Sequence, residues 1–111
     1  MDKYIVQIPR PILDQVKSIK NYISDILQSP LTAEKRSRAI IKDLRSLEFF
    51  PQRGFDADEK VGRQIASQVK TRGILVANKK YMVFYTIDEE KKLVKVSHLF
   101  STKSDCAKLF L

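Results

Sequence analysis

The sequence predicts an α+β fold in which an N-terminal strand and an antiparallel helical hairpin pack on a small antiparallel sheet. Three stretches, residues 73–77, 81–87 and 92–100, are rich in β-branched and aromatic side chains and are separated by short polar turns, as in an antiparallel meander. Residues 11–47 instead repeat apolar side chains at helical spacing. A short alternating run precedes them, so the expected order is β-α-α-β-β-β-α.

The first strand is expected over residues 3–9, where apolar side chains alternate until Pro9, which cannot donate to a ladder. A helix then begins near Pro11, because proline suits a first helical turn. Residues 28–30 break this helix, and Thr32 is expected to cap a second one with Glu34 in its first turn. The connector is short, which predicts two antiparallel neighbours.

Residues 48–71 are the least regular part of the chain. Phe49 and Phe50 are interpreted as an aromatic anchor before a turn at Gly54. Residues 56–69 fit either a short helix interrupted at Gly62 or an irregular loop. After the third meander strand, the polar residues up to Asp105 predict the start of a last helix.

Length and composition fit one domain spanning residues 1–111, with 43% hydrophobic residues. The apolar runs are too short to cross a bilayer, and the first ten residues lack the core of a signal peptide. We therefore expect a cytoplasmic protein without a membrane partner. One Cys and one His cannot assemble a metal cluster, so we expect no metal and no cofactor, and Cys106 is expected to be a small buried hydrophobe.

The net charge of +8 is distributed unevenly, because residues 60–87 contain six Lys and Arg and no acid. Such a surface attracts polyanions, which include RNA, DNA, a ribosome and an acidic protein segment, and it also fits a merely solubilising surface. Charge alone does not choose among these partners. The candidate target-binding or nucleic-acid-binding residues are Arg63, Lys70, Arg72, Lys79, Lys80 and Lys103.

Catalytic patterns are weak in this sequence, which has no Gly-rich phosphate loop and no metal-ligand spacing. A triad among Ser97, His98, Ser101 and Asp105 is not expected, because adjacent strand residues point to opposite faces. Metal-free RNA cleavage needs a base, an acid and a charge-stabilising cation, for which the candidates are Arg72, Tyr85, His98 and Lys103.

Two of these candidates also fit a purely structural role. His98 is expected to be a partly buried core histidine, on the face that alternates with Val94, Val96 and Phe100. Tyr85 lies in the middle of a strand, where an aromatic side chain is more typical of the core than of a basic groove.

The most specific pattern lies in the last third of the chain, in residues 81–90, 93–96, 98–100 and 103–105. It resembles the RelE/ParE superfamily, the small basic toxins of bacterial type II toxin–antitoxin modules, and Leu47, Pro51, Gly54 and Arg72 fall in matching places. The resemblance implies a RelE/ParE-like fold and growth arrest relieved by a cognate antitoxin. That antitoxin is expected to wrap the hairpin and the basic face. The toxin is expected to contact operator DNA only indirectly, through the antitoxin.

The chain departs from the ribonucleases of this superfamily. They have paired basic residues on the strand before the tyrosine-rich one, where this chain has Gly73 and Leu75, and an Arg after the first Tyr of the next strand, where it has Met82. They also have a Tyr near the C-terminus, whereas no Tyr follows Tyr85. Other nucleases of the family use a histidine near the end of the last strand. The residue of this chain that best matches the position of that histidine is Ser101.

These departures favour the ParE-like branch, for which the resemblance implies inhibition of DNA gyrase. Two alternatives stay open: a RelE-like, ribosome-dependent and metal-free mRNA endoribonuclease, and a basic binding module without toxicity. Whether the protein is an enzyme stays open as well.

Overall fold

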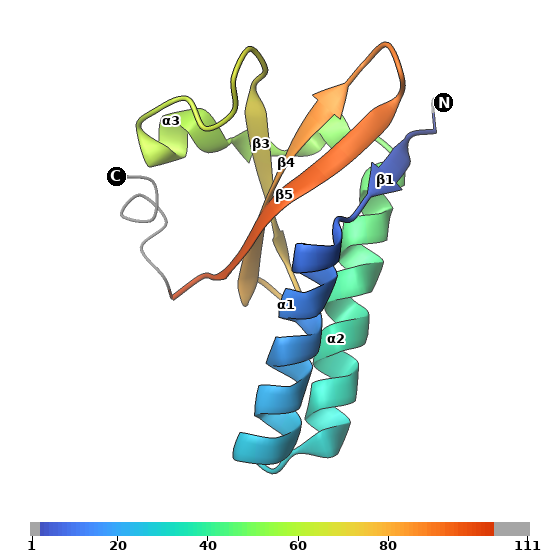
Figure 1. Cartoon of the computed structure of the whole chain (residues 1–111), viewed down its shortest axis with the longest axis vertical. Helices are drawn as coiled ribbons and strands as arrows, with labels where there is room; N and C mark the ends of the chain where they lie inside the picture. Colours follow the sequence, from blue (N-terminus) through green and yellow to red (C-terminus); the bar gives the residue numbers. More distant parts are fainter. Residues whose placement is uncertain (1–2, 104–111) are drawn as a thin grey trace.

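The computed structural model describes residues 3–103 of the chain. The helices are α1 (Arg10–Asn21), α2 (Pro30–Arg45) and α3 (Ala57–Val61), and the strands are β1 (Ile5–Gln7), β2 (Phe55–Asp56), β3 (Thr71–Val76), β4 (Tyr81–Asp88) and β5 (Leu93–Ser101). A π-helical turn, Tyr22–Ile26, extends α1. The strands form one sheet in the order β1-β5-β4-β3-β2. Helices α1 and α2 run antiparallel, side by side, and continue beyond the edge of the sheet (Figure 1).

The predicted α+β class and helical hairpin are confirmed, but the sheet is mixed rather than antiparallel. β1 pairs in parallel with β5, with Ile5 opposite Leu93 and Gln7 opposite Lys95. Alternation predicts that a strand exists, whereas its direction depends on where the hairpin returns the chain. β2 adds two residues antiparallel to β3, which is too short a run to leave a pattern in the sequence.

Helix α2 begins one turn earlier than the cap at Thr32 predicts. Pro30 opens the helix after Ser29, whose hydroxyl donates to Thr32 Oγ1 at 2.7 Å. A proline in the first turn costs no hydrogen bond, because the first amides of a helix have no partner inside it. Thr32 is therefore already helical.

The main core lies between the hairpin and the sheet. Ile40, Leu44 and Leu47 are fully buried there against Val83 and Val94. A smaller cluster of Ala57, Met82 and Phe84 packs separately. Met82 and Phe84 alternate along β4 with Val83, so the small cluster occupies the opposite face of the sheet, where Ala57 from α3 joins it.

A bulge in β5 decides which face its last residues occupy. Phe84 pairs with His98 but Tyr85 pairs with Val96, so Ser97 is an extra residue. Beyond it Leu99 joins the main core, while Phe100 packs against the small cluster. His98 is half-buried, as predicted, and lies beside Phe100. The prediction that it shares a face with Val94 and Val96 is wrong, because simple alternation does not include a bulge.

The segment between α2 and α3 also differs from expectation. Phe49 and Phe50 are 50% and 63% exposed and do not anchor the loop, whereas Pro51 is buried. α3 ends at Val61 and is followed by Gly62, whose φ of 88° is left-handed. Of the two predicted alternatives, the short helix therefore holds up to Val61 and the irregular loop holds for residues 62–70. The expected last helix and Cys106 lie outside the described residues. In residues 3–103 no helix is long and apolar enough to cross a membrane, and no cluster of metal-binding side chains occurs.

Candidate functional site

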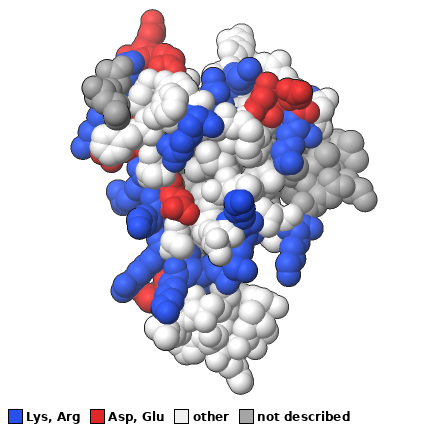
Figure 2. All heavy atoms as spheres, turned by 180° about the vertical axis from the view of Figure 1, so that it is seen from behind, with Lys and Arg blue, Asp and Glu red and all other residues white. Residues whose placement is uncertain are grey.

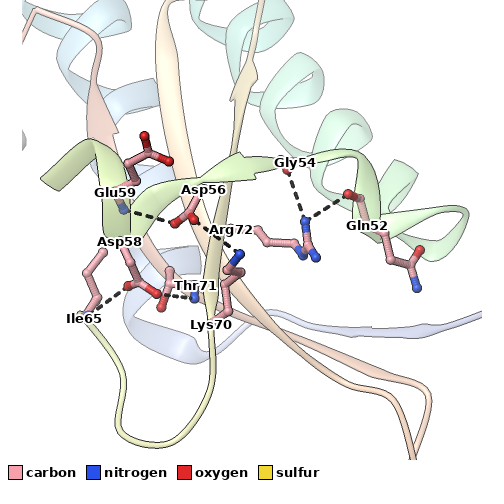
Figure 3. Close-up of polar contacts among 9 residues, drawn as sticks. All are labelled: Gln52, Gly54, Asp56, Asp58, Glu59, Ile65, Lys70, Thr71 and Arg72. Atoms are coloured by element: carbon pink, nitrogen blue, oxygen red, sulfur yellow. Dashed lines mark hydrogen bonds and ion pairs between the residues drawn. The ribbon is translucent and has the colours of Figure 1, made fainter. Parts of the chain in front are cut away.

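Tyr85 and Arg72, two predicted catalytic candidates, support the segment after α2. Tyr85 is fully buried, and its hydroxyl donates to the Pro51 carbonyl at 2.6 Å. Burial raises the pKa of Tyr85 despite the opposing charges of the arginines nearby. The Arg72 guanidinium donates to the carbonyls of Gln52 at 3.1 Å and Gly54 at 3.4 Å (Figure 3). Both side chains therefore bind the backbone of this segment.

The glycine at position 54 shows how closely this segment packs. A Cβ at Gly54 would lie 2.2 Å from the Tyr85 hydroxyl oxygen and 2.8 Å from the Gly73 carbonyl oxygen. Only a residue without a side chain lets the segment approach β3 so closely. The tyrosine hydroxyl consequently has no open path to a substrate.

His98 lies on the other face of the sheet from Tyr85. Its ring centroid is 6.1 Å from those of both Phe84 and Phe100, and burial lowers its pKa, which favours the neutral imidazole. The bulge brings His98 Nδ1 within 2.8 Å of Ser97 Oγ, although neighbouring strand side chains were expected to point apart. Ser97 itself donates to the Phe84 carbonyl at 3.2 Å, so its hydroxyl hydrogen is directed at backbone.

The four catalytic candidates are not brought together. Lys103 follows the end of β5, where Ser101 pairs with Tyr81. Tyr81 lies four residues from Tyr85 on β4, a separation of about 13 Å along a strand. Tyr85 and His98 are divided by the sheet itself. The arrangement therefore offers no common point at which these side chains could act on one substrate.

Lys70 and Arg63 belong to the loop that covers the small cluster. Lys70 pairs with Asp56 at 3.3 Å, and Asp56 also caps α3 by accepting from the Glu59 amide at 3.0 Å, a bond that lowers its pKa. Figure 3 shows the Asp58 carboxylate closing the loop between the amides of Ile65, at 2.9 Å, and Thr71, at 3.1 Å. Arg63 is exposed just after α3.

The remaining predicted contacts, Lys79, Lys80 and Lys103, do come together. They line a cavity of about 540 Å³ with Arg36, which we call the cationic cleft. None of the described residues that line it is acidic. The described residues that line it are Tyr22, Ile23, Leu27, Arg36, Asn78, Lys79, Lys80, Tyr81, Ser101, Thr102 and Lys103. In Figure 2, Lys and Arg side chains gather above the largely uncharged lobe that the end of the hairpin forms.

The turn that carries Lys79 and Lys80 is held in an unusual conformation. Ala77, Asn78 and Lys79 have φ values of 51°, 56° and 65°, in the left-handed region that non-glycine residues rarely adopt. The Asp43 carboxylate accepts from the Ala77 amide at 2.8 Å. The Thr102 hydroxyl lies 3.0 Å from the carbonyl oxygens of both lysines. These bonds fix the turn against α2 and the end of β5.

Helix residues that sequence reasoning did not select complete the cleft. Arg36 lies over the Tyr81 ring, with its guanidinium carbon 6.0 Å from the ring centroid. Tyr22 is 55% exposed in the π-helical turn. Both come from the hairpin, more than forty residues before the turn, so no local spacing in the sequence links them to Lys79.

A second cavity, of about 730 Å³, lies between α1 and α2, and we call it the hairpin groove. Leu13, Val16 and Ile41 give it an apolar floor. Its cationic rim consists of Lys17, Lys20, Arg38, Lys42 and Arg45. Glu34 pairs with Lys20 and Arg38, at 2.9 Å each, and these bonds lower its pKa. Within residues 3–103, no residue lines both the groove and the cationic cleft.

Comparison with known proteins agrees with this architecture. No curated protein sequence is significantly similar to the chain. The crystal structure of an archaeal RelE–RelB complex from Pyrococcus horikoshii OT3 contains a similar fold, with a TM-score of 0.54 and 17% identity over 89% of this chain and 94% of that chain. A family model described as "ParE toxin of type II toxin-antitoxin system, parDE" matches residues 6–105. The chain therefore belongs to the ParE family, the toxin components of type II toxin–antitoxin systems.

Proposed function

We propose that this toxin arrests growth in the cytoplasm by acting on DNA gyrase and not by cutting RNA. The observation that carries the proposal is the burial of the Tyr85 hydroxyl under the Pro51 carbonyl. General acid–base catalysis requires a group within hydrogen-bond reach of the reacting atoms. Tyr85 and Arg72 are bound to backbone, and His98 lies across the sheet, so binding to a target explains toxicity better than hydrolysis does.

The cognate antitoxin is proposed to occupy the hairpin groove. An apolar floor between two helices, with cations along the rim, fits the apolar face of an amphipathic helix whose flanks are acidic. The floor supplies area to bury and the rim selects the sign of the partner's charge. Operator DNA is then contacted through the antitoxin, which leaves the cationic cleft outside this interface.

Purified toxin tests the proposal directly in two parallel reactions. In the first, gyrase supercoils relaxed plasmid at increasing toxin concentrations, and inhibition or trapped cleaved DNA is expected near stoichiometric toxin. In the second, ribosomes translate a defined mRNA with the same toxin, and intact message is expected. The cognate antitoxin, added in excess, provides the control because it should restore gyrase in the first reaction.

The opposite pair of results decides against the proposal. If gyrase is untouched at a stoichiometric excess of toxin while mRNA is cut only in the presence of ribosomes, the toxin is a ribonuclease. In that case Arg72, Tyr85 or His98 must reach RNA after a rearrangement of the described fold, whereas Lys103 already lines the cationic cleft.

A further inference from the structure

The cationic cleft has features that contact with a protein alone does not require. Four cations from α2, the β3–β4 turn and the segment after β5 converge on it. The turn is kept left-handed over three consecutive residues, at an energetic cost, by bonds from Asp43 and Thr102. Non-glycine residues persist in such conformations only where the surroundings fix them, and such places are often binding sites.

The size and lining of the cleft match one nucleotide. Its volume of about 540 Å³ lies within the range of small-ligand sites. Arg36 offers a planar fork of donors for phosphate oxygens, and the lysines add point charges. Tyr22, which is 55% exposed, contributes an aromatic ring on which a base can stack. An acidic peptide would use the cations but would have no comparable use for this ring.

We propose that the cationic cleft binds one nucleotide of a single DNA strand, with its phosphate on Arg36, Lys79, Lys80 and Lys103 and its base on Tyr22. The base must be unpaired, because a paired base does not expose its face to a side chain. The choice of DNA over RNA rests on the proposed function, in which gyrase presents DNA to the toxin. The toxin then holds nucleic acid and gyrase together.

Binding of a fluorescein-labelled ten-nucleotide oligo(dT) to the free toxin tests this without gyrase. Lys79→Glu/Lys80→Glu should weaken binding at least tenfold. It should also reduce the dependence of log affinity on log salt by up to about 0.7, which is the contribution of the one phosphate that the cleft neutralises on a single strand. The matched control is Lys17→Glu/Lys42→Glu in the hairpin groove, which changes charge equally and should leave the oligo(dT) affinity within about twofold.

Stacking is tested separately from charge. Tyr22→Ala should weaken oligo(dT) binding about tenfold, whereas Tyr22→Phe keeps the ring and the affinity. Inorganic pyrophosphate, which has no base, should compete equally well against binding to both variants. Equal loss in the Ala and Phe variants, or no loss in either, contradicts the assignment of the base to Tyr22.

Lys79→Gly tests whether weaker oligo(dT) binding could result from a folding defect. Glycine adopts the left-handed conformation of Lys79 without strain, so this variant should melt at a higher temperature than the natural protein while binding oligo(dT) more weakly. A destabilised variant cannot produce that combination.

Three results would overturn the proposal: equal effects of the two charge-reversed pairs, equal competition by a glutamate decamer, or tighter binding of duplex DNA or of an RNA decamer than of oligo(dT). The first two indicate attraction to any polyanion, and the third indicates another nucleic acid. Because oligo(dT) binding is measured on the free toxin, a negative result in that measurement does not alter the result of the gyrase assay. A negative gyrase assay likewise leaves the oligonucleotide affinities standing.

Discussion

The hairpin groove and the cationic cleft are both rimmed by Lys and Arg, yet they are built in different ways. The groove has an apolar floor between two helices, and Glu34 engages two of its five cations. The cleft is more polar, and its charges come from three separate segments joined by hydrogen bonds. Two surfaces of one protein with a net charge of +8 can therefore suit different partners. The side chains between the cations, apolar in the groove and more polar in the cleft, determine which kind of partner fits.

The largest expected effect tests the floor of the groove. Leu13→Asp places a carboxylate where an antitoxin helix would cover it, and it should weaken antitoxin binding on the order of 100-fold, or about 3 kcal/mol. Titration of labelled toxin with antitoxin measures this. Leu31→Asp is the matched control, because Leu31 is 69% exposed and does not line the groove. The affinity of this variant for the antitoxin should not change.

If Leu31→Asp weakens antitoxin binding as much as Leu13→Asp does, the docking surface is the end of the hairpin and not the groove. Binding of oligo(dT) should be unaffected by either variant, which keeps the two surfaces separable.

A second test asks whether the buried tyrosine supports the fold or performs chemistry. Tyr85→Phe leaves the Pro51 carbonyl unpaired and should lower the free energy of unfolding by about 2 kcal/mol. Urea denaturation measures the loss, and Tyr22→Phe, at an exposed site, should show none. Growth arrest by Tyr85→Phe should persist at temperatures where it remains folded. Loss of arrest with unchanged stability would mean that the hydroxyl acts on a substrate.

The smallest effect concerns the charge on the rim of the groove. The pKa of Glu34 lies below its usual value of 4.5, chiefly through its bond to Lys20, so its charged form stabilises the folded state. That contribution is present above about pH 4.5 and is lost as pH falls through the lower, folded-state pKa. Glu34→Gln should therefore lose less stability between pH 7 and pH 3 than the natural protein does.

The same substitution frees Lys20 and Arg38 for an acidic partner. Association with the antitoxin at neutral pH should become about twofold faster at low salt, with the difference removed by high salt. Slower association in stopped-flow experiments would show that Glu34 organises the rim instead of competing for it.

Much of the fold follows from sequence because it depends on local periodicity. The hairpin and the three meander strands repeat apolar residues over enough positions to be recognised. The parallel direction of β1, the two-residue β2 and the bulge at Ser97 depend instead on distant pairing, which leaves no local signal. The error about the face of His98 follows from that bulge alone.

The candidate site was predictable only in part. The candidate basic surface predicted from the sequence includes Lys79, Lys80 and Lys103, which are three of the four cations in the cleft. Arg36 resembles any other cation on the polar face of a helix. Its role depends on the place where the hairpin lies against the β3–β4 turn, which only the tertiary structure specifies.

The pairing of β1 with β5 has a consequence for synthesis of the toxin. β5 lies between β1 and β4, so the sheet is divided until residues 93–101 have left the ribosome. A nascent chain that terminates before residue 93 contains the helical hairpin but no complete sheet for it to pack on. The apolar stripe of the hairpin then remains exposed to water. Premature termination thus gives fragments without a folded toxin, and toxicity depends on completion of the last strand.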